Sequence, residues 1–213
     1  LREHEDTQVA RNLSALTMTH RHSFPANPHR RAFLTAAGCG LAVLASPASA
    51  RAPRGQLLRQ VPPAYRDAAV RAGIPPRLLY GVALQESAML WGEKVLPWLW
   101  TLNVRGTPHR YATYDDGVRA LTNWVTVQKV RNVDCGPMQI NWRWHGDKLQ
   151  TFANALDAHY NLAVGASLLA GHYRDSGNWF AAAGRYHHPT DTVRATAYAQ
   201  GVFRRIALLQ EAA

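Results

Sequence analysis

A single glutamate on the apolar face of an expected helix is the residue in this sequence best suited to chemistry. Pro75-Pro76 is typical of a helix start. Four apolar residues then recur at helical spacing, namely Leu79, Val82, Ala83 and Leu90. Glu86 falls at i+7 of this series, on a helix expected to run to about Leu90. A carboxyl is rarely buried without a partner or a purpose, so Glu86 is either an acid catalyst or part of a buried ion pair or cap.

Other reactive residues give weaker signals. His187-His188 with Asp191 suggests a metal site, but no further ligand follows at a recognisable spacing, so we expect no metal and no cofactor. No cysteine-enzyme signature surrounds Cys135, and a lone cysteine among apolar residues is usually a packing residue. Three tryptophans could stack on a sugar or pack in the core, and core packing is the commoner role: Trp142, Trp144 and Trp179.

The segments before and after Glu86 predict short elements around it. Pro62-Pro63 and Gly73 bound an expected helix that precedes it. Alternating residues over 98–104 and 111–114, separated by a turn at 106–108, predict a small β-hairpin. Thr113 and Asp116 have the spacing of a capping box, which would start a helix through about Gln128.

The rest of the chain predicts more helices. The segment from Val133 to Asn141 is short, apolar and broken by Gly136-Pro137, so we expect a structured loop or a single turn. Helices are expected at about 162–173, 179–186 and 191–209, the last capped by Asp191. The sequence therefore predicts an α+β, mainly α domain with a minor β element.

The first 50 residues have the pattern of an export signal behind an upstream extension. From Met18 a charged region is followed by a modest apolar stretch over 32–44 and by Ala48-Ser49-Ala50, which suits cleavage after Ala50. Arg30-Arg31 fits either a twin-arginine signal or an ordinary secretory one. Residues 1–17 precede the first Met and are expected to be a non-native extension. We therefore expect a mature domain over 51–213 in the periplasm.

Positive charge belongs to this expected mature domain. The whole chain has 24 Lys+Arg against 14 Asp+Glu, and residues 51–213 keep 19 against 11. Because the basic residues are mostly single, with only Arg204-Arg205 paired in that part, we expect no nucleic-acid partner. A solvated basic surface and attraction to polyanions outside the cytoplasm both stay open. No run of about 18 apolar residues occurs, so we expect no integral membrane span in the mature protein.

Three segments, taken in order, resemble the signature motifs of the soluble lytic transglycosylase family of the lysozyme-like superfamily. They are Ala83-Leu84-Gln85-Glu86-Ser87, Gly136-Pro137-Met138-Gln139-Ile140-Asn141 and Ala181-Ala182-Ala183-Gly184-Arg185-Tyr186. The resemblance covers residues 60–212 and is closest to the transglycosylases of conjugation and integrative-element secretion systems. Pro137 departs from the usual Leu of the second motif, and His187 from the Asn of the third.

The resemblance implies a lysozyme-like fold with a small β-hairpin insertion and a specific reaction. A peptidoglycan lytic transglycosylase cleaves the MurNAc-GlcNAc bond and forms 1,6-anhydro-MurNAc. Glu86 would act first as acid and then as base, and Tyr186 would hydrogen-bond near it and near the sugar's acetamido group. The implied substrate-binding residues are Ser87, Met138, Gln139 and Asn141. The implied partners are peptidoglycan glycan strands and components of a conjugative secretion apparatus.

Two alternatives stay open. A muramidase would let water attack in place of the sugar's 6-hydroxyl, and ordinary glycosidases use a second carboxylate for this. The sequence offers Asp134, Asp115 and Asp116 for this role, but none is marked by a motif of the family, and Asp115 and Asp116 are better explained as helix-start residues. The other alternative is a non-catalytic peptidoglycan-binding assembly factor.

Overall fold

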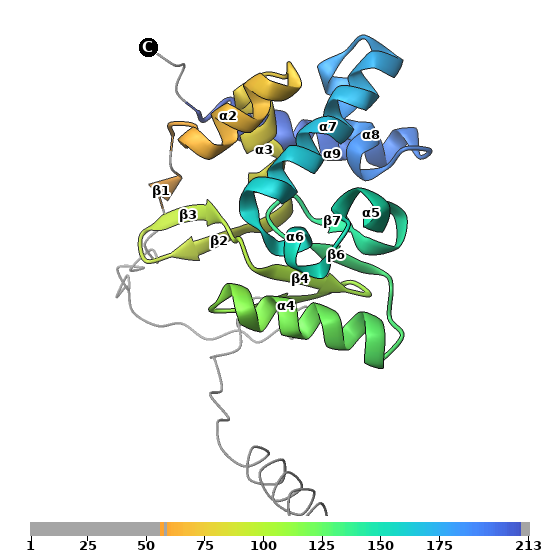
Figure 1. Cartoon of the computed structure of the whole chain (residues 1–213). Helices are drawn as coiled ribbons and strands as arrows, with labels where there is room; N and C mark the ends of the chain where they lie inside the picture. The colour runs from red at the N-terminus through yellow and green to blue at the C-terminus, as the bar shows by residue number, and fades with distance from the viewer. Residues whose placement is uncertain (1–55, 58, 210–213) are drawn as a thin grey trace, which may run out of the picture. The chain divides into compact units, whose positions relative to one another are not determined.

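Helices dominate the computed structural model, which describes residues 56–57 and 59–209 (Figure 1). They are α2 (Pro63–Ala72), α3 (Pro76–Ser87), α4 (Tyr114–Thr122), α5 (Trp142–Leu149), α6 (Phe152–Leu156), α7 (Ala158–Ser176), α8 (Trp179–His187) and α9 (Thr192–Ile206), with a π-helical turn η1 (Asn123–Val127) continuing α4. The expected extension over 1–17 and the expected signal peptide with its cleavage site after Ala50 lie outside the described residues. No helix within the described ranges is both long enough and apolar enough to cross a membrane.

Short strands form two small sheets. One has the order β1-β3-β2, from β1 (Gln56–Leu57), β2 (Ala88–Trp91) and β3 (Lys94–Pro97). The other is antiparallel with the order β5-β4-β6-β7, from β4 (Thr101–Val104), β5 (Thr107–Arg110), β6 (Val133–Cys135) and β7 (Ile140–Asn141). The expected α+β, mainly α class is therefore confirmed.

Several helix ends lie where the sequence predicts them. Gly73 ends α2 in the left-handed conformation that glycine adopts without a Cβ clash. Thr113 caps α4 by accepting a hydrogen bond from the Asp116 backbone N–H. Asp191 caps α9 by accepting from the Arg194 N–H, as expected.

Two expectations near Glu86 are wrong in detail. The helix α3 ends at Ser87, so Leu90 is not on its apolar face but on an exposed position of β2. The chain turns there because β2 and β3 form a hairpin, with Gly92 at positive φ in its two-residue turn. The expected second hairpin exists, but its return strand is Thr107–Arg110, because Arg105 and Gly106 make the tight turn.

The second half of the chain is more regular than the sequence suggests. The segment over 133–141, expected as a loop or a turn, forms strands β6 and β7 around a four-residue turn. Helices α5 and α6 were not expected, α7 is longer than 162–173, and α9 ends at Ile206 before residue 209. Short side-chain caps start α5, α6 and α7, which is why these helices can follow one another so closely.

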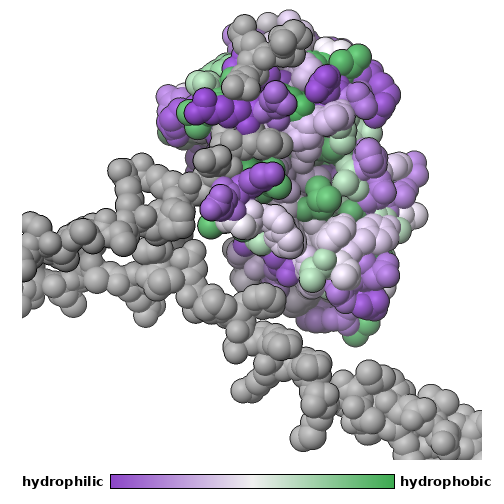
Figure 2. Space-filling view, turned by 90° about the vertical axis from the view of Figure 1, so that its left-hand side faces the viewer, coloured by the Kyte–Doolittle hydropathy of each residue, from purple (hydrophilic) through white to green (hydrophobic). Residues whose placement is uncertain are grey.

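Helix α3 lies at the centre of the core, packed against α2, α7 and α9. Its most buried side chains are fully inaccessible: Leu79, Tyr80, Val82, Ala83 and Leu84. Glycines allow the last helices to approach closely, since a Cβ on Gly184 of α8 would lie 2.7 Å from the Ala195 carbonyl oxygen of α9. On the face shown in Figure 2, hydrophilic and hydrophobic residues are interspersed over the described surface. This packing brings the C-terminal ends of α3 and α8 together with the middle of α9.

Candidate active site

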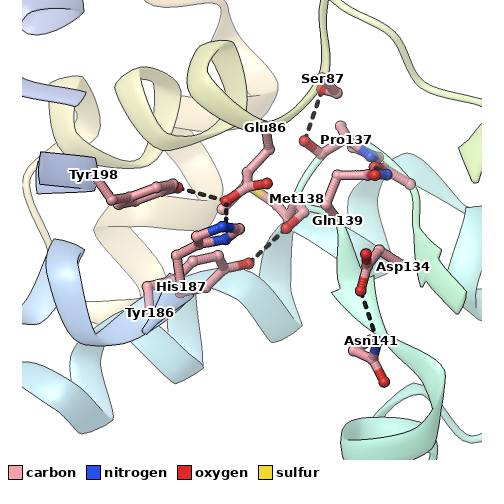
Figure 3. Close-up of polar contacts among 11 residues, drawn as sticks. Glu86, Ser87, Asp134, Pro137, Met138, Gln139, Asn141, Tyr186, His187 and Tyr198 are labelled. Carbon is pink, nitrogen blue, oxygen red and sulfur yellow. Dashed lines mark hydrogen bonds and ion pairs between the residues drawn. The ribbon is translucent and has the colours of Figure 1, made fainter. Parts of the chain in front are cut away.

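Glu86 lies in the last turn of α3, where its side chain is 9% exposed. Its Oε1 accepts a 2.6 Å hydrogen bond from the Tyr198 hydroxyl of α9. The Nδ1 of His187, at the end of α8, lies 3.4 Å from the same oxygen (Figure 3). Within the described part of the chain, Oε2 takes no hydrogen bond. The two oxygens are therefore distinct: Oε1 is held by Tyr198 and His187, and Oε2 has no hydrogen-bond partner among the described residues.

His187 and Tyr198, the two partners of Glu86, also contact each other. The His187 and Tyr198 rings stack at 4.6 Å with an interplanar angle of 12°. The hydrogen bond with Glu86 raises the pKa of His187, against the opposite effect of burial. Burial, reinforced by the charge of Glu86, raises the pKa of Tyr198 well above its ordinary value, so its hydroxyl stays a donor.

Tyr186 lies close to Glu86, and its hydroxyl bonds to the second motif and not to the acid. Its hydroxyl donates a 2.8 Å hydrogen bond to the backbone oxygen of Met138. Burial raises its pKa well above the ordinary value, and the charges of Glu86 and Asp134 add to the rise. Tyr186 therefore anchors the turn between β6 and β7, while Tyr198 is the tyrosine bonded to the acid.

The β6–β7 turn is tied to α7 by a fully buried asparagine that sequence reasoning missed. The Asn161 side chain accepts from the Met138 N–H at 2.9 Å and donates to the Cys135 and Ala155 carbonyls at 3.0 and 2.9 Å. Gly136 has a φ of +71°, and a Cβ there would lie 2.6 Å from the Asn161 amide nitrogen. Only glycine fits this position. The close packing of Gly136 on Asn161 and the Asn161 hydrogen bonds fix the position of the second motif in the fold.

Three of the implied substrate-binding residues contribute to this turn. The Ser87 hydroxyl is buried and donates to the Pro137 oxygen at 2.8 Å, while the Met138 side chain is fully buried. The side chains of Ser87 and Met138 are therefore packed beneath the surface of the site and are not accessible to a ligand. Gln139 is partly exposed, with a φ of +48° and its amide 2.9 Å from the Gly136 oxygen.

Asn141 and Asp134 form a polar pair on β7 and β6. The Asn141 amide donates to Asp134 Oδ1 at 2.7 Å and to Asn132 Oδ1 at 2.8 Å, and its oxygen caps α5. Burial raises the pKa of Asp134, and the charge of Glu86 raises it further, whereas the hydrogen bond from Asn141 lowers it. Asp134 is thus a second carboxyl within electrostatic reach of Glu86, drawn with it in Figure 3. Asp115 and Asp116 lie in the first turn of α4, as expected of helix-start residues.

Three residues with weaker chemical signals, Cys135, Trp142 and Trp179, have structural roles. Cys135 is fully buried, and burial raises the pKa of its thiol well above the ordinary value. Trp142 packs on Phe152, and Trp179 stacks on Tyr173 at 3.7 Å. Trp144 is different, being 68% exposed. Among the described residues, no group of three or more His, Cys, Asp or Glu side chains could hold a metal ion.

Two contacts in the site could have been found from a weak signal. Tyr198 is a tyrosine on the buried face of α9, followed by Ala199 and Val202, and a phenol in that position needs a polar partner. His187 directly follows Tyr186 in the sequence, so it had to lie near the acid if the third motif did.

Comparisons with protein-family models, with curated proteins and with solved structures found no match. Function is therefore inferred from the residues of the site and from the motif resemblance.

Proposed function

We propose that this protein is a peptidoglycan lytic transglycosylase with Glu86 as its acid and base. The observation that carries the proposal is the state of that side chain, almost buried at the end of α3 with Oε1 held by Tyr198 and His187. The order of the three motifs along the chain supports the same assignment.

The reaction needs one proton and returns it. Glu86 donates its proton to the glycosidic oxygen, and the bond between that oxygen and C1 of MurNAc breaks with assistance from the acetamido oxygen. The 6-hydroxyl oxygen of the same sugar then attacks C1 and displaces the acetamido oxygen, and the hydroxyl proton passes to the Glu86 carboxylate. The product carries a 1,6-anhydro ring, no water is consumed, and the proton that Glu86 donated is returned to it.

The surrounding residues divide into those that orient the acid and those that shape the sugar site. Tyr198 and His187 hold Oε1, which aims Oε2 at the substrate. Tyr186 and Asn161 fix the β6–β7 turn through Met138. The partly exposed amides, Gln139 and Asn141, are the side chains that contact sugar. Such fixed geometry lowers the barrier because the reacting groups need no reorganisation.

The fold, the cellular location and the biological task of the protein are part of the same proposal. The fold is proposed to be lysozyme-like, and the protein to be exported to the periplasm through the segment over 18–50. Its proposed task is to open the wall locally for a conjugative secretion apparatus. These proposals depend on the motif resemblance and on the sequence pattern of the first 50 residues.

One observation favours a second candidate, a muramidase. Asp134 comes from the sheet and lies within electrostatic reach of Glu86, and two-carboxylate glycosidases use such a residue to stabilise C1 or to activate water. In that reaction water, not the 6-hydroxyl, supplies the oxygen that attacks C1. The two reactions share Glu86 and differ in the role of Asp134.

The experiment is a digest of purified sacculi followed by mass spectrometry of the released muropeptides. A transglycosylase yields products lighter by one water than those of a muramidase. We expect the anhydro products, and hydrolysed products alone would establish the muramidase instead. Absence of any released muropeptide at high enzyme concentration would leave only a non-catalytic role.

A further inference from the structure

A basic cavity of about 600 Å³ opens beside the candidate active site. Seven residues line it: Arg105, Lys129, Val130, Arg131, Asn132, Arg143 and Trp144. They come from the β4–β5 turn, the segment between η1 and β6, and the start of α5. The volume lies within the range of small-ligand sites, about 300–1,000 Å³.

Four of the lining side chains are cationic and exposed. No acidic residue lines this cavity, and within the described residues none of the four forms an ion pair. Arg143 lies over the Trp144 ring at 4.9 Å, which presents a guanidinium and an exposed indole side by side. Four cations gathered around one hollow repel each other, and an anion relieves this repulsion.

Two of these cations occupy a backbone conformation that favours glycine. Arg105 has a φ of +52° and Lys129 a φ of +57°. Glycine or asparagine would adopt the positive φ of these two positions more easily, but each position is occupied by a long basic residue. Both turns project their side chains at the same cavity.

One side chain, Asn141, links the wall of the basic cavity to the residues around Glu86. Asn132, in its wall, and Asp134, near Glu86, both accept from the same Asn141 amide nitrogen. They are two residues apart on an extended segment, which is roughly 7 Å of chain. The wall of the cavity and the carboxyl nearest to Glu86 in the sheet are therefore held together by one amide group.

We propose that the basic cavity binds the carboxylates of the peptide that peptidoglycan carries on its muramic acid. The inference rests on the proposed function, since it places the sugar at Glu86 and its acidic peptide beside it. Arginine forks match carboxylates in two-pronged hydrogen bonds, and the Trp144 ring offers an apolar surface for the peptide's aliphatic parts. The cavity makes the enzyme selective for strands that still carry their peptides.

The test compares glycan strands with intact peptides and strands stripped of peptides by an amidase. The variant R131Q/R143Q removes two cavity cations, and the control R71Q/R174Q removes two exposed arginines that do not line the cavity. We expect wild type and control to have a KM at least about fivefold lower for intact strands, and the cavity variant to lose this preference. An unchanged preference in R131Q/R143Q, or equal KM values in wild type, would overturn the proposal.

A binding measurement separates this proposal from the proposed function. Trp144 is exposed in the cavity, so the tryptophan fluorescence of the full protein is followed as purified stem peptide is titrated in, and Trp144→Phe identifies the contribution of Trp144 among the seven tryptophans. We expect saturable binding that weakens with salt and is lost in R131Q/R143Q but not in the control. If neither strand type is cleaved, the transglycosylase proposal fails, while this titration still decides the cavity. Binding of inorganic phosphate or anionic vesicles without binding of the peptide would overturn the assignment.

Discussion

The Tyr198 hydroxyl and the Glu86 carboxyl, 112 residues apart in the sequence, are joined by a 2.6 Å hydrogen bond. Tyr198 belongs to α9 and Glu86 to α3, two helices that pack directly on each other. The bond fixes Oε1, and under the proposed function Oε2 is the oxygen that exchanges the proton. An acid held in this way is oriented by the tertiary fold and not by its own helix.

Replacing Glu86 by glutamine should abolish lysis while the fold is kept. The glutamine side chain has the shape of the acid but can neither donate nor regain the proton, and general acid–base catalysis contributes about 10²–10⁴-fold. The measurement is turnover on purified peptidoglycan, with circular dichroism to verify folding. Turnover within a few-fold of wild type would remove Glu86 from the reaction.

Two tyrosine-to-phenylalanine changes should have different effects because their hydroxyls have different partners. Tyr198→Phe removes the donor to Glu86 and should lower turnover by roughly 10-fold to 10²-fold. Tyr186→Phe removes the donor to the Met138 oxygen, so its main effect should be a loss of about 1 kcal/mol of stability. Turnover and thermal unfolding are measured for both variants. Equal loss of turnover with no loss of stability in Tyr186→Phe would show that Tyr186 acts on substrate.

The contact between His187 and Glu86 should make stability depend on pH. Its hydrogen bond with Glu86 raises the pKa of His187 in the folded protein above the ordinary value of about 6.5. The stabilisation is therefore fully present below about pH 6.5 and is lost as the pH rises through the folded pKa.

The difference in melting temperature between wild type and His187→Gln should accordingly be larger at pH 5.5 than at pH 9. Titration of the His187 ring by NMR provides the second measurement. The raised pKa should fall towards the ordinary value in Glu86→Gln, because the main cause of the rise is removed. A His187 titration that is the same in both proteins would contradict the contact.

Asn161→Ala should be the most destabilising single change near the site. It leaves the Met138 N–H and two backbone carbonyls without their buried partner, and each unsatisfied group costs about 1–3 kcal/mol. We expect a loss of at least about 3 kcal/mol in urea unfolding. Asn123→Ala, at an exposed asparagine, is the control and should change stability by about 0.5 kcal/mol or less. A similar stability for the two variants would refute the role of Asn161.

Local patterns predicted the parts of the site that lie on one element. The position of Glu86 on a helix followed from Pro75-Pro76 and the apolar spacing, and the caps at Thr113 and Asp191 followed from side-chain chemistry. The end of α3 was misplaced because Leu90 has the right spacing for a helix, although it lies in β2. Spacing alone does not reveal where a chain leaves a helix for a hairpin.

Contacts between distant elements were beyond the reach of such patterns. The bond from Tyr198 to Glu86 depends on how α9 packs on α3, and the hydrogen bonds of Asn161 depend on how α7 meets the β6–β7 turn. Tyr186 was placed near the acid through the motif resemblance, but its hydrogen-bond partner could be known only from the three-dimensional arrangement.

The use of α9 to hold the acid has a consequence for synthesis. A nascent chain that has not yet been extended through Tyr198 contains Glu86 and all of the second and third motifs but lacks the donor that orients Oε1. Arg77, on α3, also donates to the Ile206 and Leu209 carbonyls, so the far end of the chain is part of the frame around the acid. Under the proposed function, a chain that stops before α9 lacks the hydrogen bond that orients its acid, so we expect it to be inactive on peptidoglycan.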